Sequence, residues 1–228
     1  MSLSGKSYET IGNLLEEMNH GGKYLKNPDF AVEGFPRSAN TFLVTALNIS
    51  WPNMVVQSHS HDSKNITDAD GSFPVVSVIR NPIDAIASCS VHLSLKNPEK
   101  GKNLTRIIDL YGDIAYCASN NLNVLTIPFD EVVSNIVGIL DMLEDKYGLE
   151  RRIPTSSESV LSKTADLSRL VNQTSESFTK KGHVPRDRHP LYAEILEELK
   201  DSVYAESLNN VTKLYEDLVS KYYDETNR

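Results

Sequence analysis

Residues 30–47 read FAVEGFPRSANTFLVTAL, and the rest of the chain can be arranged around this stretch. Its first five residues are mainly apolar, as in a buried strand, and Gly34 and Pro36 then mark a turn. A helical pattern begins at about Asn40. The stretch therefore predicts a buried strand, a tight turn and the opening of a helix.

The predicted turn has the length of a phosphate-binding G-x-x-x-x-G-K-[ST] loop, but its residues differ. Ala39 stands at the second glycine, Asn40 stands at the lysine, and the positive charge is at Arg37. Backbone N–H groups at a helix start point outward with the positive end of the helix dipole behind them, so the segment can still bind an anion. Many α/β proteins open a helix with a polar cap, so a purely structural role also fits.

A second polar segment follows the strand predicted at residues 74–79, PVVSVI. It reads RNPIDAIAS from Arg80 to Ser88. Together with GFPRSANTF upstream, it resembles the cytosolic and bacterial sulfotransferase family, whose members carry a P-K-S-G-T-T-W loop and an R-N-P-x-D-x-x-x-S segment. The resemblance covers residues 30–147 and, more loosely, a basic stretch near residue 180.

This resemblance implies a co-substrate, 3′-phosphoadenosine 5′-phosphosulfate (PAPS), and no metal ion. The 5′-phosphosulfate would contact the first segment, which comprises Arg37, Ser38, Ala39, Asn40, Thr41 and Phe42. Phe42 would stack on adenine, although a core position fits it equally well. The 3′-phosphate would contact Arg80, Ser88 and the nearest match to the family's basic C-terminal segment, Lys180, Lys181 and Gly182. The glycine and tryptophan that complete that family segment are absent.

Two histidines follow the strand predicted at residues 54–57, at the end where open α/β sheets bind their ligands. A sulfuryl acceptor must lose a proton as the new S–O bond forms, and a neutral imidazole suits that task. Ser58-His59 resembles the pair that carries the family's catalytic histidine, so we expect His59 to be the base, with His61 as the alternative. Both would be ordinary loop residues if the site is not catalytic. Arg37 does not readily give up a proton, so we expect it to stabilise charge on the leaving phosphate.

The spacing of the elements predicts one α/β domain over residues 1–228, with a mostly parallel sheet flanked by helices, of the P-loop nucleotide-binding type. The strands are expected at 30–34, 54–57, 74–79 and 123–128. The helices are expected at 7–19, 40–49, 82–93, 104–119, from 129 as one long helix, and at 191–223. Residues 63–73 and 96–102 read as connections, and residues 150–190 as a candidate lid or mobile segment.

A formal charge of −8 disfavours nonspecific binding to nucleic acid or to an anionic membrane. No apolar run approaches the roughly 20 residues that span a bilayer, and residues 1–10 lack the apolar core of a secretion signal. Cys89 and Cys117 lack metal-ligand spacing. These features predict a cytoplasmic protein. The resemblance implies an enzyme, and the acidic composition favours a small-molecule acceptor, while the oligomeric state stays open.

Two other functions fit parts of the sequence. A P-loop small-molecule kinase is disfavoured because Asn40 replaces the lysine that reaches the β- and γ-phosphates, and because Arg80-Asn81-Pro82 stands where a metal-holding aspartate is wanted. A non-catalytic nucleotide-binding module would explain why Ala39 and Asn40 depart from the family loop. Such a module binds the desulfated donor without turnover.

Overall fold

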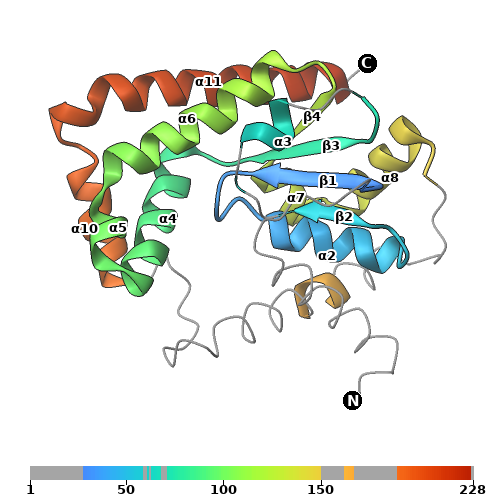
Figure 1. The fold of residues 1–228 in the computed structure, drawn as a ribbon, viewed down its shortest axis with the longest axis horizontal. Coiled ribbons are helices and arrows are strands. Elements are labelled where there is room, and N and C mark those ends of the chain that lie inside the picture. Colours follow the sequence, from blue (N-terminus) through green and yellow to red (C-terminus); the bar gives the residue numbers. More distant parts are fainter. Residues whose placement is uncertain are drawn as a thin grey trace.

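A four-stranded sheet lies at the centre of the computed structural model, which describes residues 28–58, 61, 63–67, 71–149, 162–166 and 189–226 (Figure 1). Its strands are β1 (Phe30–Gly34), β2 (Val56–Ser58), β3 (Val75–Ile79) and β4 (Val124–Pro128). They lie in the order β2-β1-β3-β4, and each neighbouring pair is parallel. The predicted α/β class is confirmed, and each strand begins within two residues of its predicted start.

The direction of the strand order reverses between β1 and β3. From β1 the chain passes to β2 on one side, then crosses back to β3 on the other side of β1. The two strands pair along their length, with Gly34 beside Val78. The segments that follow β1 and β3 therefore leave the sheet next to each other, at the kind of switch point where open parallel sheets bind ligands.

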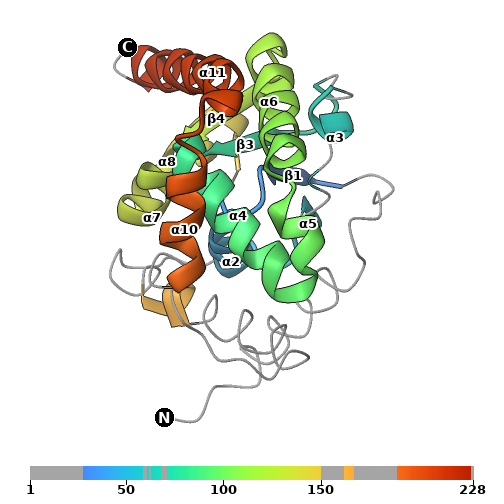
Figure 2. The ribbon, with the colours of Figure 1, turned by 90° about the vertical axis from the view of Figure 1, so that its left-hand side faces the viewer.

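Alternate strand residues face two separate apolar layers, as the two-residue period of a strand requires. Phe30 and Val32 pack on the side of α2 (Asn40–Ser50), α7 (Phe129–Ser134) and α8 (Ile136–Tyr147). Ala31, between them, packs on the side of α4 (Pro82–Lys96), α6 (Leu104–Asn120), α10 (Pro190–Glu198) and α11 (Ser202–Thr226). Figure 2 shows α6 and α11 together above the sheet, with α4 and α10 beside each other. Helices thus cover both faces of the sheet.

Three predicted segments are wrong in detail. The connection at 96–102 contains a short helix, α5 (Pro98–Lys102), because the Asn97 side chain accepts hydrogen bonds from two N–H groups of its first turn. The long helix from Phe129 divides at Asn135 into α7 and α8. The helix at 191–223 divides into α10 and α11, where Asp201 accepts a hydrogen bond from the Val203 N–H. Val203, an apolar residue in the first turn of α11, is 72% exposed.

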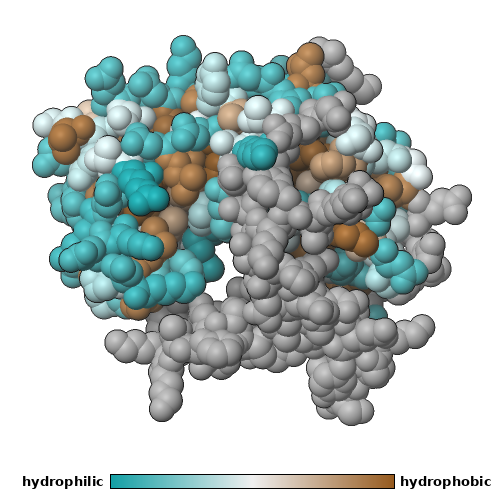
Figure 3. Space-filling model, in the orientation of Figure 1, coloured by the Kyte–Doolittle hydropathy of each residue, from teal (hydrophilic) through white to brown (hydrophobic). Residues whose placement is uncertain are grey.

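Other predicted segments lie partly or wholly outside the described residues. The helix expected at 7–19 lies outside them, as does most of the candidate lid at 150–190, of which 162–166 form a short helix. The connection at 63–73 includes α3 (Ser63–Thr67). On the face drawn in Figure 3, hydrophilic residues cover most of the surface formed by α4, α5, α6 and α11, and hydrophobic residues show in small groups. None of the described helices is both long and apolar enough to cross a bilayer.

Candidate anion-binding site

Gly34 ends β1 and precedes the loop, at a position where only a glycine fits. A β-carbon there would lie 2.5 Å from the Val78 carbonyl oxygen of the neighbouring strand. Further along the loop, Arg37 and Ala39 both have left-handed backbone conformations, with φ of 73° and 64°. Backbone N–H groups in such turns converge to form a concave anion-binding nest. The described structure therefore gives the predicted anion loop a backbone suited to that role.

Asn40 holds this loop closed. Its side chain is buried, and its amide Nδ2 donates to the carbonyl oxygens of Gly34, at 3.2 Å, and Phe35, at 3.4 Å. The lysine that a phosphate-binding loop normally carries here would instead point its charge at the ligand. Asn40 can therefore contribute its backbone N–H to an anion, whereas its side-chain amide is occupied by the loop.

The start of α2 has no side-chain cap. Its N-cap residue, Ala39, has no side chain that could accept a hydrogen bond from the first turn, and the helix has no acidic residue there. Helix starts leave up to four N–H groups without intrahelical partners. The Ser38 hydroxyl is buried and has no hydrogen-bond partner within the described ranges. A phosphate oxygen in the loop would supply acceptors for these groups, so the residues present fit an anionic ligand.

Arg80 reaches this loop from the neighbouring strand. It follows β3 directly, and its Nη1 donates to the Arg37 carbonyl oxygen at 3.1 Å. Its guanidinium carbon also lies 4.6 Å from the centre of the Phe129 ring, which follows β4. Stacking on an aromatic face and donation to a carbonyl hold the guanidinium in one place. The two predicted anion-binding segments are therefore adjacent.

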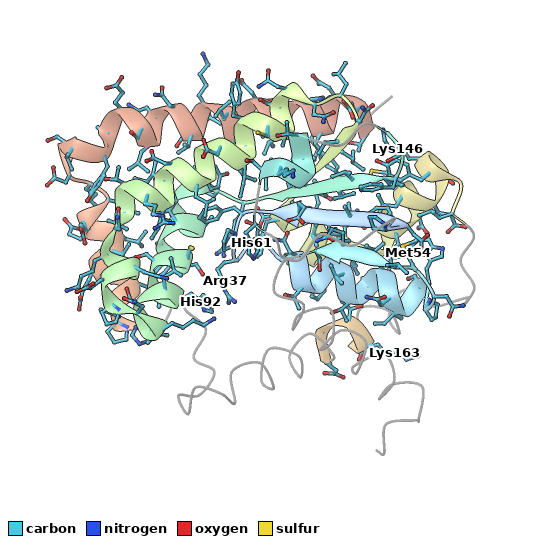
Figure 4. All side chains as sticks on the ribbon, viewed as in Figure 1. Arg37, Met54, His61, His92, Lys146 and Lys163 are labelled. Atoms are coloured by element: carbon cyan, nitrogen blue, oxygen red, sulfur yellow. The ribbon has the colours of Figure 1, made fainter. Side chains whose placement is uncertain are left out.

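His61 lies against the same loop. Its Nδ1 is 2.9 Å from the Gly34 carbonyl oxygen, and because a carbonyl only accepts, this nitrogen carries the proton. In the neutral ring, Nε2 then holds the lone pair. Burial lowers the pKa of His61, the hydrogen bond to Gly34 opposes that shift, and the positive charge of Arg37 lowers the pKa further. Figure 4 labels Arg37 and His61 at the arrowhead end of β1, whereas Met54 and Lys146 lie at the opposite end of the sheet.

The remaining predicted site residues divide into two groups. Ser88 is buried in α4, two turns after Arg80, Thr41 is half-buried in the first turn of α2, and Phe42 packs partly buried against the apolar layer under α2. His59 and the basic segment formed by Lys180, Lys181 and Gly182 lie outside the described residues. The predictions for these four residues stay predictions.

Two residues that the sequence did not assign to the site contact it. Phe129 stacks on Arg80, and Tyr111 of α6 donates its hydroxyl hydrogen to the Arg80 carbonyl oxygen at 2.6 Å. Phe129 could have been found as an aromatic residue at the end of a strand. Tyr111 could not, because its place in the helix 104–119 marks it only as one of several inward residues. In the part of the chain that the structure describes, no group of histidine, cysteine or carboxylate side chains could hold a metal ion.

No protein-family model matches the chain, and a search of curated proteins also finds no match. Among solved structures, the chain is similar to the crystal structure of mouse sulfotransferase SULT7A1 complexed with PAP. The TM-score is 0.46, the sequence identity is 15%, and the similarity covers 92% of each chain. A likeness of this size assigns neither residues nor a reaction. The fold defines the class of the protein: it is a parallel α/β protein whose candidate anion-binding loop lies at the switch point of the sheet.

Proposed function

We propose that this protein is a sulfotransferase that uses PAPS as donor and moves the sulfuryl group to an acceptor hydroxyl or amine of a small molecule. The observation that carries the proposal is the hydrogen bond from Arg80 to the Arg37 carbonyl oxygen. It brings two cationic segments together at the switch point of the sheet. PAPS has an anionic group at each end of its ribose, so a site with two adjoining anion-binding segments suits it.

In this proposal the loop after β1 holds the 5′-phosphosulfate. The backbone N–H groups of Ala39, Asn40 and Thr41 face the anion at the start of α2, and Ser38 and Thr41 add hydroxyl groups. Phe42 covers the adenine. The Arg37 guanidinium stabilises the negative charge that grows on the leaving phosphate, as fixed cations do at such sites.

Arg80 binds the 3′-phosphate in the same proposal. A guanidinium has five N–H groups, and the contact with Arg37 uses only one nitrogen, so other N–H groups can donate to a phosphate. Ser88 contributes a hydroxyl from α4. We propose that Lys180, Lys181 and Gly182 close over this phosphate, as the family resemblance implies.

A histidine of the segment after β2 accepts the proton of the acceptor. PAPS supplies an activated sulfuryl group, whose S–O bond to the 5′-phosphate breaks as the acceptor oxygen or nitrogen bonds to sulfur. His59 is the residue that the resemblance selects. The geometry favours His61 as this base. Its Nδ1–H donates to the Gly34 carbonyl oxygen, and its lowered pKa keeps the ring neutral near pH 7. The enzyme would work in the cytoplasm, where thiols such as Cys89 and Cys117 stay reduced.

Calorimetric titration with adenosine 3′,5′-bisphosphate, ADP and ATP with Mg²⁺ tests this function. We expect the 3′,5′-bisphosphate to bind most tightly, and Arg80→Ala to weaken its binding by about 1.5–3 kcal/mol, the range for a charge-assisted hydrogen bond. Arg106→Ala is a matched control, because Arg106 lies in α6 on the exposed surface. An unchanged affinity for Arg80→Ala would remove this residue from the site.

The same titration separates the other functions. Tight binding of ATP with Mg²⁺, with indifference to the 3′-phosphate, would favour a small-molecule kinase. Tight binding of the 3′,5′-bisphosphate with no transfer of label from PAPS to a panel of phenols, alcohols and amines would favour a non-catalytic module.

A further inference from the structure

Tyr111 contacts both anion-binding segments from the middle of α6. Its hydroxyl donates to the Arg80 carbonyl oxygen at 2.6 Å, and its ring centre lies 5.1 Å from that of Phe35, in the loop after β1. The side chain is 2% exposed, so it has no alternative position in solvent. One rigid ring therefore connects the end of β3 to the start of the loop.

The hydrogen bond acts on the backbone of Arg80 between two elements. Arg80 stands between the last residue of β3 and Asn81, the N-cap of α4, so its carbonyl belongs to neither the strand nor the helix. The guanidinium is held at the other end by the Arg37 carbonyl oxygen. Tyr111 holds the backbone of Arg80, and the loop holds its guanidinium, so the side chain has few rotamers left. Little conformational entropy of Arg80 is therefore lost when an anion binds.

The tyrosine stays a donor under all ordinary conditions. Burial raises the pKa of Tyr111 far above its usual value, and the nearby Tyr215 raises it further. A phenol that stays protonated always has a hydrogen to offer the carbonyl.

We propose that Tyr111 is a positioning residue, which holds Arg80 in place for the 3′-phosphate and thereby sets the preference of the site for nucleotides that carry this group. This inference rests on the proposed function for its ligand, but not for the contact between Tyr111 and Arg80. It predicts that loss of one hydroxyl, 2.6 Å from a backbone atom, changes the selectivity of a site that the hydroxyl does not touch.

Tyr111→Phe is the variant that tests the proposal, because it keeps the ring against Phe35 and removes only the hydrogen bond. The affinities for adenosine 3′,5′-bisphosphate and adenosine 5′-phosphate are measured by calorimetry. We expect affinity for the bisphosphate to fall about 3- to 10-fold, the effect of losing one hydrogen bond, with little change for the 5′-phosphate. A purely structural role would weaken both nucleotides equally, so an unchanged ratio of the two affinities overturns the proposal.

Tyr192→Phe is the matched control. Tyr192 is also buried, and its hydroxyl donates to Asp84 of α4 at 3.0 Å, one turn beyond Arg80. We expect this variant to lower the melting temperature to a similar extent while leaving the ratio of the two affinities unchanged. Equal loss of selectivity in both variants would mean that general loosening of α4, and not Tyr111, is responsible.

A ligand-free measurement separates failure of this inference from failure of the proposed function. The Nε–H signal of Arg80 in a proton–nitrogen NMR spectrum is assigned from its loss in Arg80→Lys. We expect it to shift in Tyr111→Phe and to stay in place in Tyr192→Phe. If wild-type protein fails to bind the bisphosphate, the proposed function is wrong, and the Arg80 signal still decides whether Tyr111 positions this side chain.

Discussion

Ala39 has a left-handed backbone although it is not a glycine, with φ of 64° and ψ of 18°. A β-carbon in this region costs about 1–2 kcal/mol. We therefore predict that Ala39→Gly raises the free energy of unfolding by about 0.5–1 kcal/mol, since the relief of strain exceeds the extra freedom that glycine gives the unfolded chain. Denaturant unfolding measures this change.

Ala46→Gly is the control for that measurement, because Ala46 is buried within the same helix, α2, in ordinary helical conformation. Glycine inside a helix is about 1 kcal/mol less favourable than alanine, so this variant should be less stable than the wild type. Destabilisation of similar size at both positions would show that the loop carries no strain at Ala39.

His61 makes the stability depend on pH. Burial, and to a lesser degree Arg37, lower its pKa below the unfolded value of 6.5, against the opposing effect of the Gly34 hydrogen bond. The stability held by the neutral ring is therefore full above pH 6.5 and is lost as the pH falls through the lower, folded pKa. In unfolding experiments between pH 8 and about pH 5, we expect wild-type protein to lose more stability than His61→Gln. Parallel pH curves for the two proteins would contradict a lowered pKa.

At the level of elements, α5 packs on α4 through a glycine. Ser90 Oγ donates to the Gly101 carbonyl oxygen at 2.5 Å, and a β-carbon at Gly101 would lie 2.6 Å from the Ser90 carbonyl oxygen and closer still to Ser94. We predict that Gly101→Ala lowers the free energy of unfolding by about 1–3 kcal/mol, because α5 must move away from α4. Denaturant unfolding measures this loss, and we expect the m-value to stay unchanged.

Gly112→Ala in α6 is the matched control for this packing contact. A β-carbon at Gly112 would meet only Val211 Cγ1, at an ordinary 3.4 Å. Alanine favours a helix over glycine by about 0.5–1 kcal/mol, so this variant should be more stable than the wild type. A loss of stability in Gly112→Ala equal to that in Gly101→Ala would mean that close packing is not what distinguishes the two positions.

The division of a predicted helix at Asn135 also belongs to the level of elements. The apolar pattern continues through α7 and α8, with Val132, Ile136 and Leu140 all buried, so periodicity alone predicts one helix. Asn135 has φ of −130° and ψ of 39°, and its side chain occupies the space beside Gly138. The apolar residues on both sides of the break still reach the same layer under the sheet. The apolar pattern therefore predicts which residues face the core, but it does not predict where a helix is interrupted.

At the scale of the molecule, the candidate anion site brings together segments that are distant in sequence. The loop at residues 35–39, Arg80, Tyr111 and Phe129 come from different parts of the chain and are brought together by the β2-β1-β3-β4 order. The chain as a whole has a formal charge of −8, so positive charge near an anionic ligand has to be concentrated locally. In the candidate site, Arg37 and Arg80 lie together where the two central strands, β1 and β3, end.

The sequence predicted much of this arrangement. Short apolar runs that end in polar residues were sufficient to find the four strands of the described sheet. The family resemblance assigned Arg37 and Arg80 to two anion-binding segments, and the structure brings these two residues into contact. The helical period also accounts for the buried faces of α6 and of most of α11, because burial repeats with the period of the element. The predicted α/β class follows from the alternation of these strands and helices.

Local pattern carried no information about contacts between elements. Whether Asn40 points at a ligand or back into its own loop depends on the carbonyl groups of Gly34 and Phe35, which the turn brings within reach of its side chain. The hydroxyl of Tyr111 finds its acceptor 31 residues away, across the packed faces of α6 and β3. Periodicity in a sequence marks one face of an element as apolar. Hydrogen bonds between elements depend on distances and angles that exist only once the strands have paired and the helices have packed on the sheet.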